Sequence, residues 1–299
     1  FGIYIAKSNG VVAEDSGNNS LFIDDIFSLI DNEYVDTVNM KDLQMKTITS
    51  MLESMDPHSE YIKPEILDEV NESLKGSFHG IGVSFRIEKD TITIINTIKG
   101  GPSEKVGIMA GDRIIYVGDS LVAGNKVTNK TAMSLLKGER GTMIDVKIKR
   151  RGVDGLLDFT IKRDVIPTYS VDISYMIDDE IGFIKITKFS ATTHKEFVQA
   201  IKKLKSEGMT KLILDLRDNT GGYLGEGVGV VDELLPDNNL IVYTQGEHRD
   251  RSYIFSRHRG LWENNDVVVL INEGSASASE IVAGALQDND RGVIIGRRS

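Results

Sequence analysis

The sequence predicts a multidomain α/β protein in which a helical region, a small β-rich domain and a layered α/β domain follow one another. The first observation is length, because 299 residues provide for about two domains. The second is that the residue pattern changes twice. Helical spacing gives way to short strands and glycine turns near residue 75, and strands alternate with helices from about residue 166. We therefore expect domains at residues 1–74, 75–165 and 166–299.

The helical region rests on the spacing of apolar residues. They recur at helical intervals in residues 22–30 and again in residues 43–52. The run Asp-Pro-His-Ser at residues 56–59 is a strong stop and turn signal. Residues 64–74 then predict one more short helix.

The second domain is expected to consist mainly of short strands. Its strands are expected at residues 80–85, 91–95, 111–117, 144–149 and 159–163, and short helices at residues 104–106 and 131–136. Glycine turns separate these runs, which is typical of a small β-rich domain.

The third domain alternates strands with helices. The expected strands are residues 181–186, 211–216, 240–244, 267–271 and 293–295, and the expected helices are residues 195–206, 228–235 and 279–286. The apolar run at 267–271 is typical of a parallel strand covered on both faces. This alternation predicts a layered α/β domain. Because the last strand-like run stands directly before the final residues, we expect the fold to continue beyond residue 299.

Composition and charge exclude several function classes. Hydrophobic residues make up 40% and charged residues 27%, as in soluble globular proteins. The 35 Lys and Arg are outnumbered by 45 Asp and Glu, which gives a net charge of −10. Nonspecific nucleic-acid binding and a polybasic hold on anionic lipid both need a basic face, so both are disfavoured. With 0 Cys, thiol catalysis, disulfides and Cys-based metal sites are excluded.

The serine-rich run at residues 274–280 is the segment richest in chemistry. It follows a buried strand and opens a helix, so Ser277 would stand where open α/β sheets place their sites. The N–H groups at such a helix start can stabilise an oxyanion. The same residues also form a capping box, with Ser277 as cap and Glu280 three residues later. The pattern alone favours the cap.

A second polar turn follows the apolar strand at residues 211–216. It ends in Gly221 and Gly222, whose conformational freedom can leave backbone N–H groups available to an anion. Taken alone, the turn is better explained as an ordinary strand-to-helix loop. Taken with the serine run, the two turns could meet at one edge of the sheet and share an oxyanion site. Asp215 and Asp218 resemble an acid–base pair, but we expect structural roles for them, with Arg217 as an ion-pair partner.

A third glycine-rich turn comprises Gly80, Ile81, Gly82 and Val83. A turn that enters an edge strand suits capture of a C-terminal carboxylate by backbone N–H groups. It lacks the third glycine and the helix of a dinucleotide fingerprint. None of the five His stands in a pair with metal-ligand spacing, and His58 is expected to be a turn residue. We expect no metal and no cofactor.

Taken together, the motifs resemble one family. They are Tyr-Val-Asp at 34–36, Asp-Pro-His-Ser-Glu-Tyr at 56–61, Gly-x-Phe-x-Gly-Ile-Gly at 76–82, Gly-Pro-Ser at 101–103, Gly-Asp-Arg-Ile at 111–114, Leu-Asp-Leu-Arg-Asp-Asn-Thr-Gly-Gly at 214–222 and Gly-Ser-Ala-Ser-Ala-Ser-Glu at 274–280. This ordered set resembles the carboxyl-terminal processing peptidases, or tail-specific serine proteases, of the S41 group. The resemblance implies a PDZ domain at 75–165 and a crotonase-like α/β protease core, incomplete at its C-terminal end, at 166–299.

The resemblance also implies roles for residues. It makes Ser277 the nucleophile of a Ser/Lys dyad, Ala278 with Gly221 or Gly222 the oxyanion donors, and Gly80 to Val83 the peptide-binding loop. The family's general-base Lys follows the last strand, beyond residue 299, and Arg297 and Arg298 cannot replace it because guanidinium stays protonated. We therefore expect a serine endopeptidase that recognises C-terminal tails, and little or no activity in residues 1–299 alone.

Two other functions stay open at this stage. One is a noncatalytic PDZ-based peptide-binding protein on a protease-like scaffold, and the other is a crotonase-like enzyme that handles small acyl substrates. The family resemblance and the apolar residues 1–6 favour an extracytoplasmic location, periplasmic or membrane-anchored. These residues are either the tail of a removed signal or anchor helix, or a stub without structure. The expected partners are proteins or peptides with free C-termini; the oligomeric state is not predicted.

Overall fold

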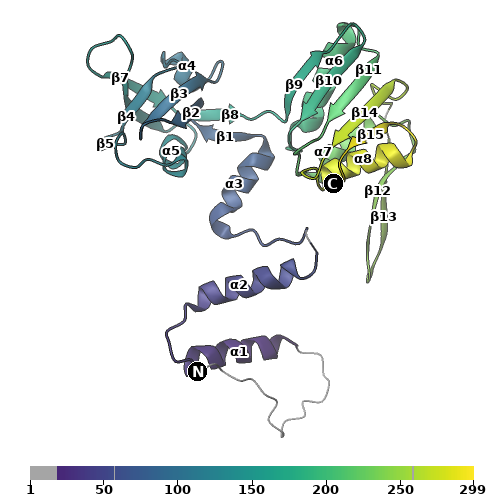
Figure 1. Ribbon diagram of the computed structural model, residues 1–299, viewed down its shortest axis with the longest axis horizontal. Helices are drawn as coiled ribbons and strands as arrows, with labels where there is room; N and C mark the ends of the chain where they lie inside the picture. The colour runs from purple at the N-terminus through teal and green to yellow at the C-terminus, as the bar shows by residue number, and fades with distance from the viewer. Residues whose placement is uncertain (1–18, 57, 258) are drawn as a thin grey trace. The chain divides into compact units, whose positions relative to one another are not determined.

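The computed structural model describes residues 19–56, 58–257 and 259–299 (Figure 1). The chain divides into two units, of which the first ends at Leu67 and the second comprises Asp68–Ser299. The expectation for residues 1–6 lies outside the described residues. In the described part of the chain, no helix combines the length and the apolar character that a membrane span requires.

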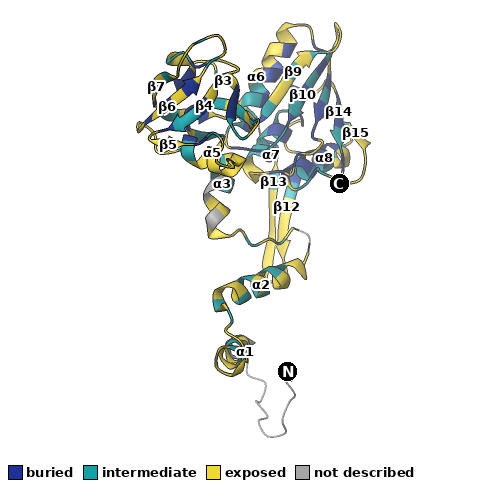
Figure 2. Ribbon diagram, turned by 60° about the vertical axis from the view of Figure 1, so that its left-hand side comes forward, coloured by how far each residue is buried: buried dark blue, intermediate teal, exposed yellow. Residues whose placement is uncertain are grey.

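The first unit contains the helices that the apolar spacing predicts. They are α1, Asn19–Glu33, and α2, Met40–Glu53, and α3, Pro64–Lys75, continues from this unit into the next. The side chain of Asn39 caps α2 by accepting the Asp42 N–H at 3.3 Å. No residue of α2 is buried (Figure 2). The side chains of Phe22 and Met51 are exposed.

The second unit begins with a β-rich domain. Its main sheet has the order β2-β3-β4-β6-β7, with β5 paired to β4. The strands are β2 Val83–Ile87, β3 Ile92–Thr97, β4 Arg113–Val117, β5 Ser120–Leu121, β6 Met143–Lys149 and β7 Leu157–Lys162, and the helices are α4 Pro102–Lys105 and α5 Asn129–Leu136. Alternate residues of β6 point into the core, which explains its strict alternation of apolar and polar residues. A separate ribbon pairs β1, Ser77–Gly80, with β8, Asp164–Pro167.

The α/β domain is built on a five-stranded sheet of order β15-β14-β11-β10-β9. Strands β10 Ile181–Ile186, β11 Lys211–Asp215, β14 Asp266–Ile271 and β15 Val293–Gly296 are parallel, and β9 Val171–Met176 is antiparallel to β10. Three helices accompany the sheet: α6 Thr193–Ser206, α7 Leu224–Asp232 and α8 Ala278–Asp288. The predicted alternation of strands and helices is therefore confirmed.

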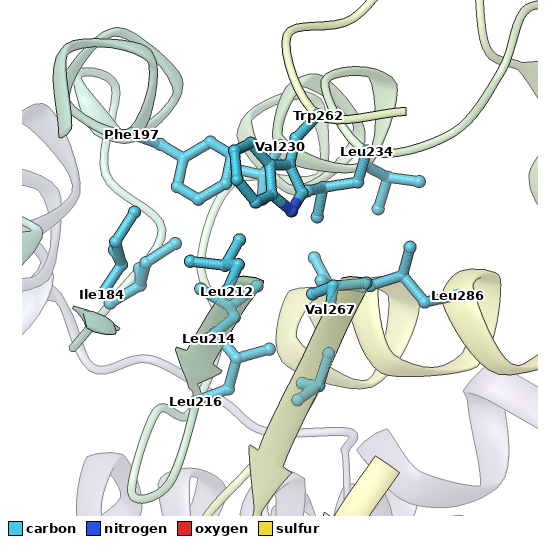
Figure 3. Packing of buried hydrophobic residues seen from close by; sticks show 14 of the residues in the cluster. Ile184, Phe197, Leu212, Leu214, Leu216, Val230, Leu234, Trp262, Val267 and Leu286 are labelled. Atoms are coloured by element: carbon cyan, nitrogen blue, oxygen red, sulfur yellow. The ribbon is translucent and has the colours of Figure 1, made fainter. Parts of the chain in front are cut away.

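The core of this domain lies between the sheet and the three helices (Figure 3). Ile184, Leu212, Leu214 and Val267 from the strands pack against Phe197, Val230 and Leu286 from the helices, and all are nearly inaccessible to water. Trp262 closes the same cluster, and its indole N–H donates to the Asp266 carbonyl at 3.2 Å. This rigid layer fixes the carboxyl ends of β11 and β14, from which the candidate site emerges.

Two expectations for this domain were wrong. Strand β14 is not covered on both faces, because Val267 and Val269 are buried whereas Val268 and Leu270 are only half-buried. Helix α7 begins at Leu224 and not at residue 228. The strand expected at 240–244 is confirmed as β12, Leu240–Gly246, but it lies outside the main sheet and pairs in a hairpin with β13, Arg249–Phe255. This hairpin extends away from the sheet, and most of its residues are exposed (Figure 2).

Candidate active site

Two polar turns meet at the carboxyl edge of the sheet. Strands β11 and β14 are parallel neighbours, so the turn after Asp215 and the turn after Ile271 emerge side by side. The Leu216 N–H donates to the Leu270 carbonyl at 2.9 Å, and the Ala276 N–H donates to the Asn219 carbonyl at 3.0 Å. These contacts show that the two turns form one structure at this edge of the sheet.

Two asparagines that the sequence analysis did not single out lock the turns together. The Asn272 side chain accepts the Asp218 N–H and donates to the Asp218 carboxylate, each at 2.8 Å. The Asn219 amide donates to the Ile186 carbonyl at 2.9 Å, which fixes the turn to β10. Both residues follow buried strands, and this position is the signal that could have identified them. Their side chains replace backbone pairing that irregular turns lack.

The three serines of residues 275–279 have different surroundings. Ser275 and Ser279 are 1% and 0% exposed. The Ser275 hydroxyl donates to the Leu216 carbonyl and the Ser279 hydroxyl donates to the Asn219 carbonyl, both at 2.8 Å. These two hydroxyls therefore bind one turn to the other. Ser277, between them, is exposed.

The backbone of Ser277 adopts an uncommon conformation. Its φ is 53° and its ψ −115°, in a region that non-glycine residues seldom occupy and that costs about 1–3 kcal/mol. Ser277 and Glu280 form the predicted capping box at the start of α8, and the Glu280 carboxylate accepts the Ser277 N–H at 2.9 Å. The cap and an exposed hydroxyl therefore coexist in one residue. Strain of this kind, held in place by specific contacts, is characteristic of functional sites.

The paired glycines lie directly against this serine. Gly221 has a φ of 99°, and a Cβ atom on it would stand 2.7 Å from the Ser277 Cβ and 3.0 Å from the Ala278 nitrogen. Gly222 has a φ of 144°, and a Cβ there would stand 2.2 Å from the Phe189 carbonyl oxygen. Both positions exclude a side chain, because of conformation and because of space.

The available N–H groups differ between the two glycines. The Gly221 N–H donates to the Asn219 side chain at 2.9 Å, so it already has an acceptor. In the described part of the chain, the N–H groups of Gly222 and Ala278 have none. Ala278 is the first residue of α8, where a helix leaves its N–H groups unpaired. Of the two glycines, only Gly222 therefore has an N–H group in the described ranges that is available to an anion.

Asp215 is part of the scaffold. Its side chain is 1% exposed and receives two bonds from the Arg217 guanidinium, at 2.9 and 2.8 Å, while the Lys185 ammonium stands 3.5 Å away. Burial raises the pKa of Asp215, but the bonds from Arg217 and the charge of Lys185 outweigh it, so the pKa lies below its usual range. A carboxylate held in this way is a poor proton acceptor at neutral pH.

The described residues do not place a lysine base at Ser277. In these ranges, no Lys side chain hydrogen-bonds to the Ser277 hydroxyl, and no group of three or more His, Asp or Glu residues has metal-binding geometry. The His58 N–H donates to the Asp56 carboxylate at 2.7 Å, within the turn expected there. The serine and the two unpaired N–H groups are therefore present in the described ranges without a lysine base.

The turn at residues 80–83 borders a groove in the β-rich domain. The groove has a volume of about 440 Å³, and its apolar wall includes Phe85, Met133 and Leu136. The Ile81 carbonyl accepts bonds from Ser103, and the Gly82 carbonyl accepts the Ile98 N–H. In the described part of the chain, the N–H groups of Ile81 and Gly82 have no acceptor. Two adjacent free donors at the end of an apolar groove suit a carboxylate.

Comparison with known proteins identifies both domains. Residues 180–299 match the model of peptidase family S41, and residues 80–161 match that of the PDZ domain. A carboxy-terminal-processing protease of Bartonella bacilliformis is 36% identical over 92% of this chain and 63% of its own length. Carboxy-terminal processing protease CtpA of Bacillus subtilis is 32% identical over 98% of this chain and 63% of its own length.

Among solved structures, the photosystem II D1 C-terminal processing protease is 24% identical, with 94% of this chain and 81% of that chain covered and a TM-score of 0.44. The chain spans a little under two thirds of the length of the two relatives named above. The chain therefore matches the PDZ domain over residues 80–161 and peptidase family S41 over residues 180–299.

Proposed function

We propose that the protein is a serine endopeptidase that binds the C-terminal tails of protein substrates in its PDZ groove and cleaves them with Ser277. The observation that carries the proposal is the contrast among the three serines. Only Ser277 is exposed, at a strained φ of 53° and beside two N–H groups that lack acceptors, those of Ala278 and Gly222. The relatives' names, which describe carboxy-terminal processing proteases, support the same activity.

The chemistry follows from these contacts. The Ser277 hydroxyl attacks the carbonyl carbon of a peptide bond, and the N–H groups of Ala278 and Gly222 stabilise the negative oxygen that forms. A serine hydroxyl is a weak nucleophile at neutral pH, so a base must accept its proton. We propose a Ser/Lys dyad in which burial keeps the lysine neutral, because desolvation disfavours the charged form. The resemblance to the family supports this base; none of the described residues supplies it.

The PDZ groove is expected to require a free carboxylate. A peptide that ends in an apolar residue should bind the 299-residue chain at least about tenfold more tightly than the same peptide with a C-terminal amide, a difference of about 1.4 kcal/mol. The reason is that the Ile81 and Gly82 N–H groups form stronger hydrogen bonds with a charged carboxylate than with a neutral C-terminal amide. Isothermal titration calorimetry measures both affinities. Equal affinities would contradict the proposed role of the groove.

A matched pair of variants controls this measurement. Gly82 and Gly124 both have positive φ, 72° and 79°, so alanine strains each backbone. A Cβ on Gly82 would stand 2.9 Å from Ile166, whereas a Cβ on Gly124 would have nothing within 4 Å. Gly82→Ala should weaken binding of the acid peptide, and Gly124→Ala should leave it unchanged.

We also propose that the full-length protein acts outside the cytoplasm. The family resemblance and the apolar residues 1–6 support this location. Fractionation of cells that express the full-length protein should place it in the periplasm, the medium or the membrane fraction. Recovery from the cytosol alone would contradict the proposal.

A further inference from the structure

Asn219 joins three segments of the candidate site and is completely buried. Its side-chain amide donates to the Ile186 carbonyl at the end of β10 and accepts the Gly221 N–H, each at 2.9 Å. Its backbone carbonyl accepts the Ala276 N–H at 3.0 Å and the Ser279 hydroxyl at 2.8 Å. An amide suits this position because it supplies a donor and an acceptor at once, whereas an ionised carboxylate has no donor.

The bond to Gly221 determines which N–H groups the site can offer. Gly221 lies directly against the serine, since a Cβ on it would stand 2.7 Å from the Ser277 Cβ. Without the Asn219 side chain, the Gly221 N–H would be free to turn toward a negative oxygen at this place. With that side chain as its acceptor, this N–H is already paired inside the protein.

The next peptide group is held from the other side of the turn. The Phe189 N–H donates to the Gly221 carbonyl at 2.9 Å, and the Tyr223 N–H donates to the Phe189 carbonyl at 2.8 Å. A trans peptide group points its C=O and its N–H in opposite directions, so the Gly222 N–H points away from Phe189. Strand β11 lies between β10 and β14, so this direction leads toward the turn that carries Ser277.

We propose that Asn219 is a positioning residue that selects the oxyanion donor. By binding the Gly221 N–H, it holds the turn in the orientation in which the Gly222 N–H, together with that of Ala278, faces the oxygen that becomes negative. Asn219 itself touches no substrate and acts through Gly222. The proposal rests on Ser277 being the nucleophile.

The first test needs no variant. Amide hydrogen exchange is measured residue by residue in the full-length protein, both free and after Ser277 has reacted with a small fluorophosphonate, whose phosphonyl oxygen stands in for the oxyanion. In the free protein, the Gly221 amide should exchange more slowly than those of Gly222 and Ala278, because it alone has an acceptor. In the adduct, Gly222 and Ala278 should become protected and Gly221 should not change. Protection gained by Gly221 in place of Gly222 would overturn the proposal.

The second test compares Asn219→Ala with Asn219→Ser in the full-length protein. Both variants lose the donor to Ile186, but a serine hydroxyl still accepts the N–H two residues further on, more weakly than asparagine does. In Asn219→Ala, kcat and the rate of fluorophosphonate labelling should fall about 10- to 100-fold, because one oxyanion donor is displaced. Asn219→Ser should recover much of this loss, and both variants should bind the tail peptide as wild type does. Ser279→Ala is the matched control, since it removes a bond to Asn219 and leaves the Gly221 bond in place.

A purely structural role for Asn219 predicts a different pattern, in which the loss of rate follows the loss of Tm. Asn219→Ala and Asn219→Ser would then be equally slow, or both would react at the rate of Ser279→Ala, and either result would contradict the proposal. Should Asn219→Ala fail to fold, Asn219→Ser and the exchange measurement decide. If wild-type protein is neither labelled nor active, the peptidase function itself is contradicted, and the positioning role with it. If wild type is active and only the predicted difference between the variants is missing, the positioning role alone is wrong.

Discussion

Ser277→Ala in the full-length protein is expected to abolish peptide cleavage while tail binding persists. The substitution removes the hydroxyl that attacks the substrate, so kcat should fall by several orders of magnitude, as when a member of a catalytic unit is removed from other serine proteases. If Ser277 were only a helix cap, alanine would cost about 0.5–2 kcal/mol of stability and leave a working enzyme with a lower Tm. Cleavage of a tailed substrate, calorimetry with the tail peptide and thermal unfolding together distinguish these outcomes.

The neighbouring serines are the matched controls. Ser275→Ala and Ser279→Ala each remove a buried hydroxyl that donates to a carbonyl of the opposite turn, so each should lower the Tm by destabilising the junction. Both variants should still cleave and should still be labelled by a fluorophosphonate at Ser277. A dead control beside an active Ser277→Ala would mean that another serine is the nucleophile. Normal cleavage by all three variants would mean that residues 275–279 only begin helix α8 and supply no nucleophile.

Gly221→Ala is expected to have the second largest effect, about 10²–10³-fold in kcat. The new Cβ would stand 2.7 Å from the Ser277 Cβ and 2.8 Å from the Ala276 carbonyl oxygen. Neither atom is the end of a flexible side chain, so neither can move aside without moving the backbone. The turn that contains Gly221 must therefore move. This movement takes the neighbouring Gly222 N–H away from the position in which it would donate to the oxyanion. Loss of one such donor costs about this factor in other proteases. Fluorophosphonate labelling should slow in parallel, because it uses the same donors.

Gly225 provides the control for this substitution. It belongs to α7, four residues after Gly221, and a Cβ there would have nothing within 4 Å. Gly225→Ala should therefore retain activity, and its free energy of unfolding should rise by up to about 1 kcal/mol, because alanine suits a helix better than glycine does. Equal loss of activity in Gly221→Ala and Gly225→Ala would show that the clash of a side chain at Gly221 is not the cause of the loss.

Strong periodicity made most of the fold predictable from the sequence. The alternation in β6 and the apolar stripe of α6 are local signals, and both elements lie where they were expected. Strand β13 lacked such a signal, because nearly all of its residues are exposed and its sequence is rich in charge. The start of α7 was hidden by glycines that packing requires: a Cβ on Gly229 would stand 2.8 Å from the His194 ring, and one on Gly227 would stand 3.2 Å from the Ala278 Cβ.

The candidate site was predictable in its parts but not in its arrangement. Sequence spacing identified the serine run and the glycine pair, yet on periodicity alone it preferred a cap for Ser277. The exposed hydroxyl and the positive φ arise from contacts between two turns that are more than fifty residues apart in the chain, such as the bond from Ala276 to Asn219. The pairing of the Gly221 N–H with the Asn219 side chain likewise depends on the folded shape of the turn.

The backbone of Ser277 also limits which nucleophiles the site can accommodate. Threonine carries the same hydroxyl as serine, and some enzymes use it for acyl transfer. A β-branched side chain at a φ of 53°, however, is a genuine outlier, because its second substituent on Cβ crowds the backbone. Threonine at this position would have to abandon either the conformation or the bond to Glu280 that holds it. The fold therefore accommodates serine, a primary alcohol, at position 277 and does not accommodate threonine, a secondary alcohol.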